Sequence, residues 1–343
     1  MYTIEANNVN DALYYGAEML LEQGICESSR NGEVLVMDAP VATTYLRPEQ
    51  RVLFSPFRDA NPFFHLMECL WMMQGGNQLD FLTRLNKRMA EFSDDGSILW
   101  GAYGWRWQYF FGYDQIANIV NELTRNPHSR RCVLSMWDGR GDLRIATSGG
   151  KDVPCNTHAY FGIRGGKLNM TVCNRSNDVI WGAYGANAVH FSFLQEFMAA
   201  AIGVEVGTYT QFSNNYHVYL GNYNEAALRQ LAEEGSAHNY YRPTPHSPLK
   251  QPVTNYPIIS IDPGLWHQDL EIFMSDRWGI AEYRDPFFQR VALPMRLAWE
   301  ERKEKKGDGL GHAATIQAED WGLACYEWIL RRERKKGVAN APA

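Results

Sequence analysis

The segment KDVPCNTHAYF, residues 151–161, places a cysteine directly after a proline and ahead of polar and aromatic side chains. Such a cysteine can be a small core residue, half of a disulfide, a metal ligand or a nucleophile. The chain has six cysteines, but they are scattered without a CxxC pair and do not resemble a disulfide framework. His158 follows Cys155 without a second ligand pair of suitable spacing, so we expect no metal. A core thiol and a nucleophile remain as interpretations of Cys155.

Four arginines stand at predicted boundaries between elements, namely Arg30, Arg130, Arg131 and Arg175. A guanidinium group suits phosphate because it binds two oxygens at once. Each arginine alone is better explained as a surface charge or a salt bridge, but the four together make a phosphate site an equal alternative. Cationic neighbours would also lower the pKa of Cys155 below the free value of about 8.5.

A polar cluster precedes a predicted buried helix in the segment NRSNDVIWGAYGAN. An asparagine offers both a donor and an acceptor, so it can read one edge of a base. A helix N-terminus also favours anions. Ordinary helix capping explains one or two of these side chains but not the whole set. The cluster consists of Asn174, Ser176, Asn177, Asp178 and Asn187.

Two further sites carry polar groups in apolar surroundings. The segment YHVYL puts His217 and Tyr219 on one face of a strand, where they can bind a sugar hydroxyl. The pattern alone favours the alternative that their hydrogen bonds are satisfied at the sheet edge. Glu68 lies inside the apolar segment FFHLMECLWMM, where a carboxylate is costly unless it is paired or lines a cavity. A functional carboxylate and a salt bridge at the helix edge are equal alternatives for Glu68.

The elements that must position these residues indicate an α+β protein. Apolar spacing and terminal Gly or Pro predict helices over 10–24, 62–76 and 113–127, and an almost wholly apolar helix over 185–203. The β-rich segments are 130–138, 157–176 and 207–220, with a hairpin signal in IRGGKL. We therefore expect a mixed or antiparallel sheet packed on one central buried helix.

The composition changes after about residue 235, where a polar, proline-rich loop is followed by two amphipathic helical segments, 286–306 and 318–336. This pattern predicts a catalytic domain over 1–250 and a mainly helical extension over 251–343 packed on it. The aromatic residues of the extension have helical spacing and are expected to pack onto the main domain. The basic end, LRRERKKG, is typical of a solvated helix end and does not favour nucleic-acid binding.

The overall composition limits the class of protein. The chain has 343 residues, 45% hydrophobic and 21% charged, with a net charge of −6, which is typical of a soluble globular protein without a nucleic-acid footprint. No stretch approaches the roughly 20 apolar residues of a membrane span, and the N-terminus lacks the features of a signal peptide. We therefore expect no membrane partner and a cytoplasmic location, or the host cytoplasm if a phage encodes the chain.

Taken in order, these pieces resemble the thymidylate synthase family over roughly residues 10–220. Each motif alone is weak, but the ordered set at near-family spacing is specific. The matching motifs are R-x-x-G at Arg30, E-x-x-W at Glu68, Y-G at Tyr103, S-R-R at 129–131, P-C at Cys155, R-S-x-D at 175–178, Asn187, and H-x-Y at 217–219.

The resemblance implies a homodimer with a sheet interface and a folate-dependent one-carbon transfer to C5 of a pyrimidine nucleoside monophosphate. Cys155 would be the nucleophile that adds to C6, and C5 would then attack the methylene of 5,10-methylenetetrahydrofolate, the co-substrate. Glu68 and Tyr103 would manage proton transfers.

The resemblance also implies the binding residues. Asn187 would read the base, and two arginines would reach the phosphate from the partner subunit. The implied phosphate ligands are Arg30, Arg175 and Ser176 with Arg130 and Arg131 of the partner, the sugar ligands are His217 and Tyr219, and the folate contacts are Asp178 and Gly182.

Departures from the family pattern indicate which reaction is catalysed. Met89 and Phe92 stand where thymidylate synthases carry tryptophans over the folate, and Asn156 replaces the histidine after the nucleophile. After the folate leaves, hydride gives a methyl group at C5, whereas water gives a hydroxymethyl group. A weaker aromatic shield, with Asn156 and His158 nearby, favours entry of water. The chain therefore looks most like the dUMP/dCMP hydroxymethylase branch.

Two alternatives remain at this stage. The first is an ordinary thymidylate synthase with a divergent folate pocket. The second is a catalytically silent nucleotide- or RNA-binding protein on the same fold, against which the presence of Cys155, Glu68 and Tyr103 argues.

The base is the least determined part of the prediction. In the family, asparagine at the central-helix position goes with uracil and aspartate with cytosine. Placing Asn187 there requires one extra residue in GAYGAN relative to the thymidylate synthase pattern. Uracil is favoured on this placement, and deoxyribose is favoured over ribose, but cytosine stays open because an amide can turn over.

Overall fold

The structure, a computed structural model, describes residues 1–275, 277–279 and 281–339. The chain forms two compact units. The first, called here the sheet unit, comprises residues 1–51 and 71–235, and the second, the helical unit, comprises residues 52–70 with the chain from Ser236 onward.

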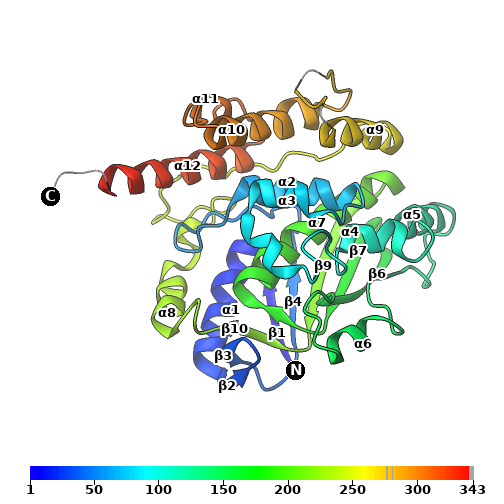
Figure 1. Cartoon of the computed structure of the whole chain (residues 1–343), viewed down its shortest axis with the longest axis horizontal. Coiled ribbons are helices and arrows are strands. Elements are labelled where there is room, and N and C mark those ends of the chain that lie inside the picture. The colour runs from blue at the N-terminus through cyan, green and yellow to red at the C-terminus, as the bar shows by residue number, and fades with distance from the viewer. Residues whose placement is uncertain (276, 280, 340–343) are drawn as a thin grey trace. The chain divides into compact units, whose positions relative to one another are not determined.

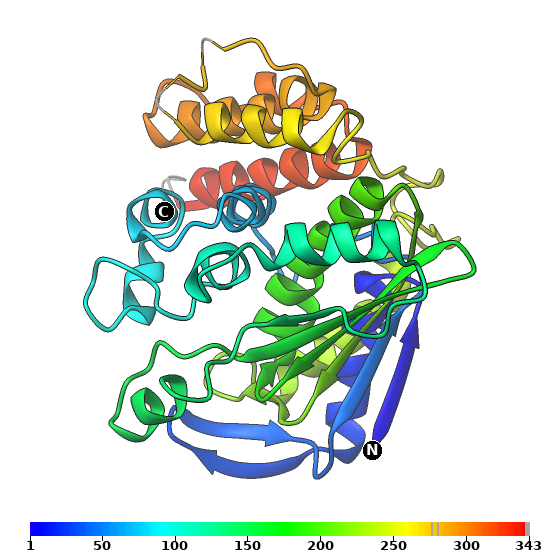
Figure 2. The same ribbon diagram turned by 90° about the vertical axis from the view of Figure 1, so that its right-hand side faces the viewer.

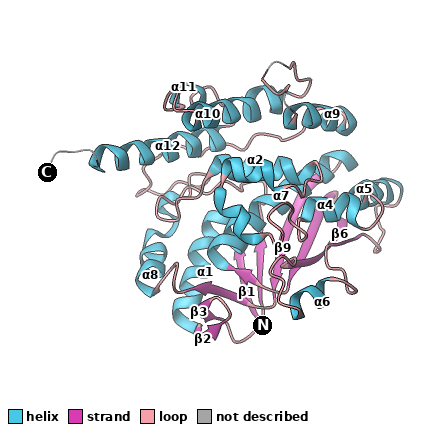
Figure 3. Cartoon of the chain, viewed as in Figure 1, coloured by secondary structure: helices cyan, strands magenta, loops and turns pink. Residues whose placement is uncertain are grey.

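The sheet unit is built on a six-stranded mixed sheet with the strand order β1-β4-β9-β7-β6-β5. The pairs β1–β4 and β7–β9 are parallel, and the other neighbours run antiparallel (Figures 1 and 3). The predicted mixed sheet is therefore confirmed. The strands are β1 (Tyr2–Ala6), β4 (Val41–Tyr45), β5 (Val133–Ser135), β6 (Asn156–Arg164), β7 (Lys167–Asn174) and β9 (Glu205–Ser213).

Helix α7 (Asn187–Ile202) is the central buried helix that the sequence predicts. It connects the parallel strands β7 and β9 and packs on both of them. Every residue from Asn187 to Ala199 is buried, and this includes the polar residues of the segment. A helix that is apolar on nearly all sides is expected to be buried in this way. Gly203 ends the helix in the left-handed region, with φ of 84°, and its N–H caps the carbonyls of the last turn.

A second sheet of four short strands, in the order β2-β3-β10-β8, carries several of the polar residues. The hairpin of β2 (Ile25–Ser29) and β3 (Gly32–Val36) places Arg30 in its turn (Figure 2). Strand β10 (Tyr216–Tyr219) runs antiparallel to β3 and parallel to the two-residue strand β8 (Asn177–Asp178).

Two further helices of the sheet unit, α1 (Val9–Gln23) and α5 (Gln115–Arg125), agree with the predicted segments 10–24 and 113–127 to within a few residues, whereas the shorter helices of this unit were not predicted. Polar side chains cap α1 and α5, because Asn8 accepts from the first backbone N–H groups of α1 and Asp114 does so for α5. The elements are α1 (Val9–Gln23), α3 (Leu79–Leu85), α4 (Tyr103–Trp105), α5 (Gln115–Arg125), α6 (Asp142–Thr147), α8 (Glu225–Glu234), a 3₁₀ helix (Lys87–Phe92) and π-helical segments at Arg106–Phe110 and Val179–Ala186.

The helical unit holds the predicted C-terminal helices together with an earlier part of the chain. Helix α2 (Pro62–Met73) begins in this unit and ends in the sheet unit. The other elements are a 3₁₀ turn that begins at the unit boundary (Gly235–His238), α9 (Pro263–Met274), a π-helical turn (Phe288–Ala292), α10 (Leu293–Lys303), α11 (Leu310–Ala313) and α12 (Glu319–Ala339).

The C-terminal aromatic residues have a core of their own. Phe63 of α2 packs against Trp299 and Trp328, with ring centroids 5.8 Å and 5.7 Å apart. The basic helix end is also paired inside this unit, because Arg331 and Arg332 both donate to Asp59. Trp299 and Trp328 therefore pack within the helical unit, and the interpretation of the whole basic end as solvated is wrong for these two arginines.

The compact units do not coincide with two consecutive blocks divided at residue 250. Residues 52–70 belong with the chain from Ser236 onward, because Phe63 and Asp59 complete its core and its ion pairs. The assignment of separate domains to 1–250 and 251–343 stays a prediction. Within the described residues, no helix is both long and apolar enough to cross a lipid bilayer.

A buried ion pair holds the loops in front of β6. Arg106 and Asp142 are both fully buried, and the guanidinium makes two bonds to the carboxylate, of 2.6 Å and 2.8 Å. Arg106 also donates to the carbonyl of Met136, and the indole N–H of Trp100 donates to Asp142. These bonds join residues 100–106, which include α4, to residues 136–142, which precede the loop that carries Cys155.

Replacing Asp142 with alanine would leave the Arg106 guanidinium buried without its counter-ion. We expect the free energy of unfolding of Asp142→Ala to fall by about 3–5 kcal/mol in chemical denaturation. The exposed pair Lys167–Glu205 is the control, because Lys167→Ala should change that free energy by no more than about 1 kcal/mol. Equal effects of the two substitutions would contradict this role of the buried pair.

Candidate active site

Cys155 ends the loop before β6 and is held by two of the predicted site residues. The Tyr103 hydroxyl oxygen accepts from the backbone N–H groups of Cys155 and Asn156, both at 3.2 Å. The backbone N–H of Arg175 donates to the carbonyl of Cys155 at 2.9 Å. Its guanidinium donates to the carbonyls of Pro154 and Val153 and lies 3.8 Å from the Cys155 sulfur. The structure therefore brings Cys155, Tyr103 and Arg175 together.

Two carboxylates that the sequence analysis did not single out fix the same loop. Asp152 accepts from the backbone N–H groups of Trp100 and Gly101, which precede Tyr103. Asp94 accepts from the backbone N–H groups of Lys151 and Asp152. The loop that carries Cys155 and the segment that carries Tyr103 are thus joined twice, once through the Asp152 carboxylate and once through the tyrosine hydroxyl.

The electrostatic surroundings of Cys155 differ from those predicted. Burial raises the pKa of the Cys155 thiol above its usual range, while the guanidinium groups of Arg175 and Arg30 act in the opposite direction. The prediction of a lowered pKa is therefore wrong, because desolvation outweighs the two positive charges. Burial likewise raises the pKa of Tyr103 well above its usual range, so its phenol stays protonated at neutral pH.

Asn187 lies next to Asn156 at the start of α7. The Nδ2 of Asn156 donates to the Oδ1 of Asn187 at 3.0 Å, and the Nδ2 of Asn187 donates to the Oδ1 of Asn177 at 2.9 Å. A Cβ added to Gly182 would lie 2.6 Å from the Oδ1 of Asn177. A glycine at position 182 is therefore required by this close approach.

The backbone before Asn187 could accommodate the extra residue that the predicted placement of Asn187 requires. The segment Val179–Ala186 is π-helical, and non-helical backbone at Tyr184 and Gly185 interrupts it. A π-helical turn holds one more residue than an α-helical turn, so it can absorb an insertion. Helix α7 then begins with regular geometry at Asn187.

Asp178, His217 and Tyr219 lie together on the small sheet. His217 is paired in register with Asp178 across β10 and β8, and its ring packs edge-on against that of Tyr219, with centroids 4.9 Å apart. Burial lowers the pKa of His217, and the Asp178 carboxylate opposes this shift. Asp178 also accepts from the backbone N–H groups of Ile180 and Trp181 and so caps the π-helical segment.

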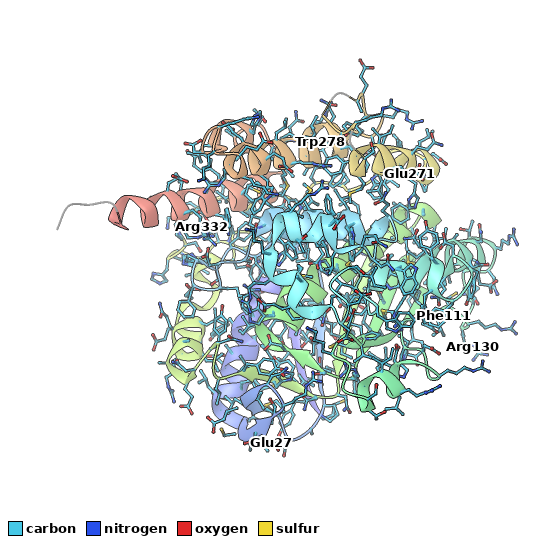
Figure 4. All side chains as sticks on the ribbon, in the orientation of Figure 1. Glu27, Phe111, Arg130, Glu271, Trp278 and Arg332 are labelled. Carbon is cyan, nitrogen blue, oxygen red and sulfur yellow. The ribbon has the colours of Figure 1, made fainter. Side chains whose placement is uncertain are left out.

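The other predicted residues lie elsewhere. Ser176 directly follows Arg175 and is half-buried, whereas Arg30 is exposed in the β2–β3 turn. Arg130 and Arg131 are exposed and line a surface hollow after α5 together with Asn126, His128 and Ser129. Figure 4 shows Arg130 at the periphery of the sheet unit. Glu68 lies in the part of α2 that belongs to the helical unit, with a half-buried side chain.

His158 does not share the surroundings of Asn156. A bulge between these two residues shifts the register of β6 against β7, so that the side chains after the bulge lie on the other face of the sheet. His158 packs on Tyr160, which is 46% exposed, whereas Asn156 is fully buried beside α7. The bulge therefore separates the surroundings of His158 from those of Asn156, and the predicted part of these two side chains in admitting water stays a prediction.

The segment where the folate-covering tryptophans are absent is exposed. Met89 and Phe92 lie on the 3₁₀ helix Lys87–Phe92, which buries none of its residues, and the Phe92 side chain is 55% exposed. Phe92 therefore contributes little to a closed aromatic core.

This geometry, a cysteine beside an arginine with an asparagine at the head of a central helix, agrees with the comparison with known families. The thymidylate synthase family model matches residues 55–249. The chain therefore belongs to the thymidylate synthase family, as its motifs indicate.

Three relatives are all deoxyuridylate hydroxymethyltransferases of phages. The protein of Pseudomonas phage M6 is 46% identical over 340 residues, which cover 97% of this chain and 95% of that protein. That of Bacillus phage SP01 is 38% identical over 54% of this chain and 50% of its own length. That of Delftia phage PhiW-14 is 30% identical over 63% of this chain and 62% of its own length. The predicted resemblance to the hydroxymethylase branch is confirmed, and the first of these relatives also shares most of the chain beyond residue 249.

The raised pKa of Cys155 is testable by alkylation. We expect the rate of iodoacetamide modification at Cys155 to rise with pH and to show an apparent pKa above the ordinary value of about 8.5. Arg30→Gln should raise that pKa further, because the substitution removes a charge that favours the thiolate. Peptide mass spectrometry separates Cys155 from the other cysteines, and the urea-unfolded protein is the reference. An apparent pKa below that of the unfolded chain would contradict the account.

Proposed function

We propose that this protein transfers a one-carbon group from 5,10-methylenetetrahydrofolate to C5 of dUMP and that water completes the reaction, giving 5-hydroxymethyl-dUMP. The observation that carries the proposal is the Cys155 thiol held beside Arg175 and Tyr103, in a chain 46% identical to a deoxyuridylate hydroxymethyltransferase over nearly its whole length. All three relatives are deoxyuridylate hydroxymethyltransferases, which favours dUMP over dCMP.

The first step is the addition of the Cys155 sulfur to C6 of the pyrimidine. The S–C6 bond forms as the C5=C6 double bond gives its electron pair to C5, which becomes nucleophilic. The thiol must lose its proton first, and the guanidinium groups of Arg175 and Arg30 favour the thiolate. A nucleotide phosphate held by Arg30, Arg175 and Ser176 would lie close to this thiol, which suits the exposed position of both guanidinium groups.

Tyr103 is suited to donate a hydrogen bond to the base, within the proton-transfer role that the family resemblance implies. Its oxygen already accepts from two backbone N–H groups, and its hydroxyl hydrogen remains available for donation. The elevated pKa keeps that hydrogen in place at neutral pH. Glu68 keeps the second proton-transfer role that the family resemblance implies.

The remaining substrate contacts follow the family roles. His217 and Tyr219, paired on β10, bind the sugar, and Asn187 reads the base. The residues around Asp178 fit a folate, because the adjacent Trp181 indole is 47% exposed and offers an aromatic surface. Asp178 and Gly182 orient the folate. The folate supplies a carbon at the oxidation level of formaldehyde, which bonds to C5 of the nucleotide. Loss of the C5 proton and departure of tetrahydrofolate leave a methylene group at C5, and addition of water to this group expels the Cys155 sulfur from C6 and restores the C5=C6 double bond.

Asn156 supports water rather than hydride as the final reactant. Its side chain is fully buried, and its Oδ1 has no hydrogen-bond partner within the protein among the described residues. A buried oxygen in that state accepts a hydrogen bond from any water that enters. The exposed Phe92 gives little shielding in the segment where the folate-covering tryptophans are absent.

A second copy of this chain is the proposed partner. The face of the six-stranded sheet opposite α7 carries exposed apolar side chains, including Tyr160 at 46% and Val133 at 40%. Pairing of this face in a homodimer would bury them and would let Arg130 and Arg131 reach the partner's phosphate site. Because the three relatives are phage proteins, we propose that the enzyme acts in the cytoplasm of a host cell.

Product analysis tests the reaction. Incubation with dUMP and methylenetetrahydrofolate should give a nucleotide heavier by one CH₂O unit, together with tetrahydrofolate, and Cys155→Ala should form no product while still binding dUMP. Assays of dCMP, UMP and CMP in parallel identify the base and sugar. Dihydrofolate with a methylated nucleotide would instead indicate thymidylate synthesis, and no product from any nucleotide would favour a silent binding protein.

Sharing of arginines across the dimer predicts recovery of activity in mixtures. Cys155→Ala and Arg131→Ala should each be nearly inactive alone. After mixed refolding, activity should return to about a quarter of the wild-type value, because half of the dimers are hybrids that contain one complete site. Each variant refolded by itself is the control. A mixture as inactive as its components would contradict the shared site.

A further inference from the structure

Four buried amide side chains form one hydrogen-bonded chain that includes the proposed base-reading residue. We call it the amide relay, and it consists of Gln211, Asn177, Asn187 and Asn156. Each member is at most 6% exposed. The links are Gln211 Oε1 to Asn177 Nδ2 at 3.0 Å, Asn177 Oδ1 to Asn187 Nδ2 at 2.9 Å, and Asn187 Oδ1 to Asn156 Nδ2 at 3.0 Å.

The direction of the relay is set at one end by a group that can only accept. The Nε2 of Gln211 donates to the carbonyl of Ala183 at 2.8 Å, and a backbone carbonyl cannot donate. The Oε1 of Gln211 must therefore face Asn177, and the Nδ2 of Asn177 must donate to it. The same requirement passes to Asn187, whose Nδ2 must face Asn177 and whose Oδ1 must face Asn156. If any one of these amides turned over, two donors or two acceptors would face each other inside the protein, and their hydrogen bonds would be lost.

A fixed amide can match only one of the two bases. In the relay, Asn187 uses one hydrogen of its Nδ2 and one lone pair of its Oδ1, so one donor and one acceptor remain for a ligand. Uracil presents an acceptor at O4 beside a donor at N3, whereas cytosine presents a donor at N4 beside an acceptor at N3. The two bases therefore require opposite orientations of the same amide.

We propose that the amide relay, anchored at the Ala183 carbonyl through Gln211, locks Asn187 in one orientation and thereby selects uracil over cytosine. The proposal rests on the proposed function, which makes dUMP the substrate. Gln211 and Asn177 are positioning residues in it, because they act on the base only through Asn187. If the anchor is lost, the other three amides can turn over together, since the far Oδ1 of Asn156 has no protein partner to lose among the described residues.

Gln211→Leu tests the relay without adding charge or touching the base. Binding of dUMP and of dCMP is measured by calorimetry in the absence of folate, and the ratio of the two dissociation constants is compared. We expect the preference of the wild type for dUMP to fall about tenfold or more in Gln211→Leu, because Asn187 can then adopt the orientation that suits cytosine. An unchanged ratio in the folded variant would overturn the proposal.

Gln195→Leu is the matched control. Gln195 is also fully buried, and its Nε2 donates to the carbonyls of Leu168, Gly207 and Thr208, but it has no link to Asn187. We expect this variant to lose stability and keep the wild-type ratio. A purely structural role of Gln211 would make the two variants behave alike, and equal shifts of the ratio would also overturn the proposal.

Asn156→Asp gives an independent test if Gln211→Leu does not fold. A carboxylate at position 156 cannot donate to the Oδ1 of Asn187 and would repel it. Asn187 would then be favoured in the opposite orientation, with its Nδ2 facing the carboxylate, so the preference for dUMP should again fall. An unchanged ratio would again count against the relay. The activity of the wild type separates this inference from the proposed function. If the wild type does not convert dUMP, the proposed function is refuted. If it does, and both variants keep the wild-type ratio of dissociation constants for dUMP and dCMP, only the relay is refuted.

Discussion

The hydroxyl oxygen of Tyr103 is the point on which the arrangement of the site depends. It accepts from the backbone N–H groups of both Cys155 and Asn156, and so it positions the backbone of the cysteine and of the last amide of the relay together. Asp152 makes the reciprocal connection, from the cysteine loop back to the backbone before Tyr103. The proposed nucleophile, Cys155, and the Asn156 partner of the proposed base-reading Asn187 are thus held by one junction, and the buried pair of Arg106 and Asp142 supports it. Disturbing the junction would alter chemistry and base recognition at once.

The elements with strong local signals could be predicted from the sequence. The apolar run bounded by Gly203 predicts α7, because a helix buried on all sides has no polar face, and the pair Gly165–Gly166 predicts the β6–β7 hairpin, where both residues have positive φ. The motifs around Cys155, Arg175 and Asn187 likewise identified the family that the comparisons confirm. The helix and the hairpin depend on residues close together in the sequence, and local physics determines them, whereas the family was identified from the order and spacing of motifs along the chain.

The parts that could not be predicted depend on contacts between distant residues. The pKa of Cys155 is set by burial, which the number of nearby arginines does not reveal. The bulge that separates Asn156 from His158 has no marker in the sequence. Gln211 had a usable signal, because it occupies the buried phase of β9 between Tyr209 and Ser213, where a polar side chain requires partners. Its partners lie on other elements, so that signal indicates a network without naming its members.

The central claim is that Cys155 forms a covalent bond to C6 of dUMP as the folate delivers its carbon. A 5-fluoro analogue of dUMP tests it most directly, because fluorine at C5 cannot leave as a cation and the reaction stops with the nucleotide bound. We expect incubation with this analogue and methylenetetrahydrofolate to give protein whose mass is increased by both molecules, with the label on the peptide that contains Cys155. Unmodified protein, or a label on a different cysteine, would contradict it.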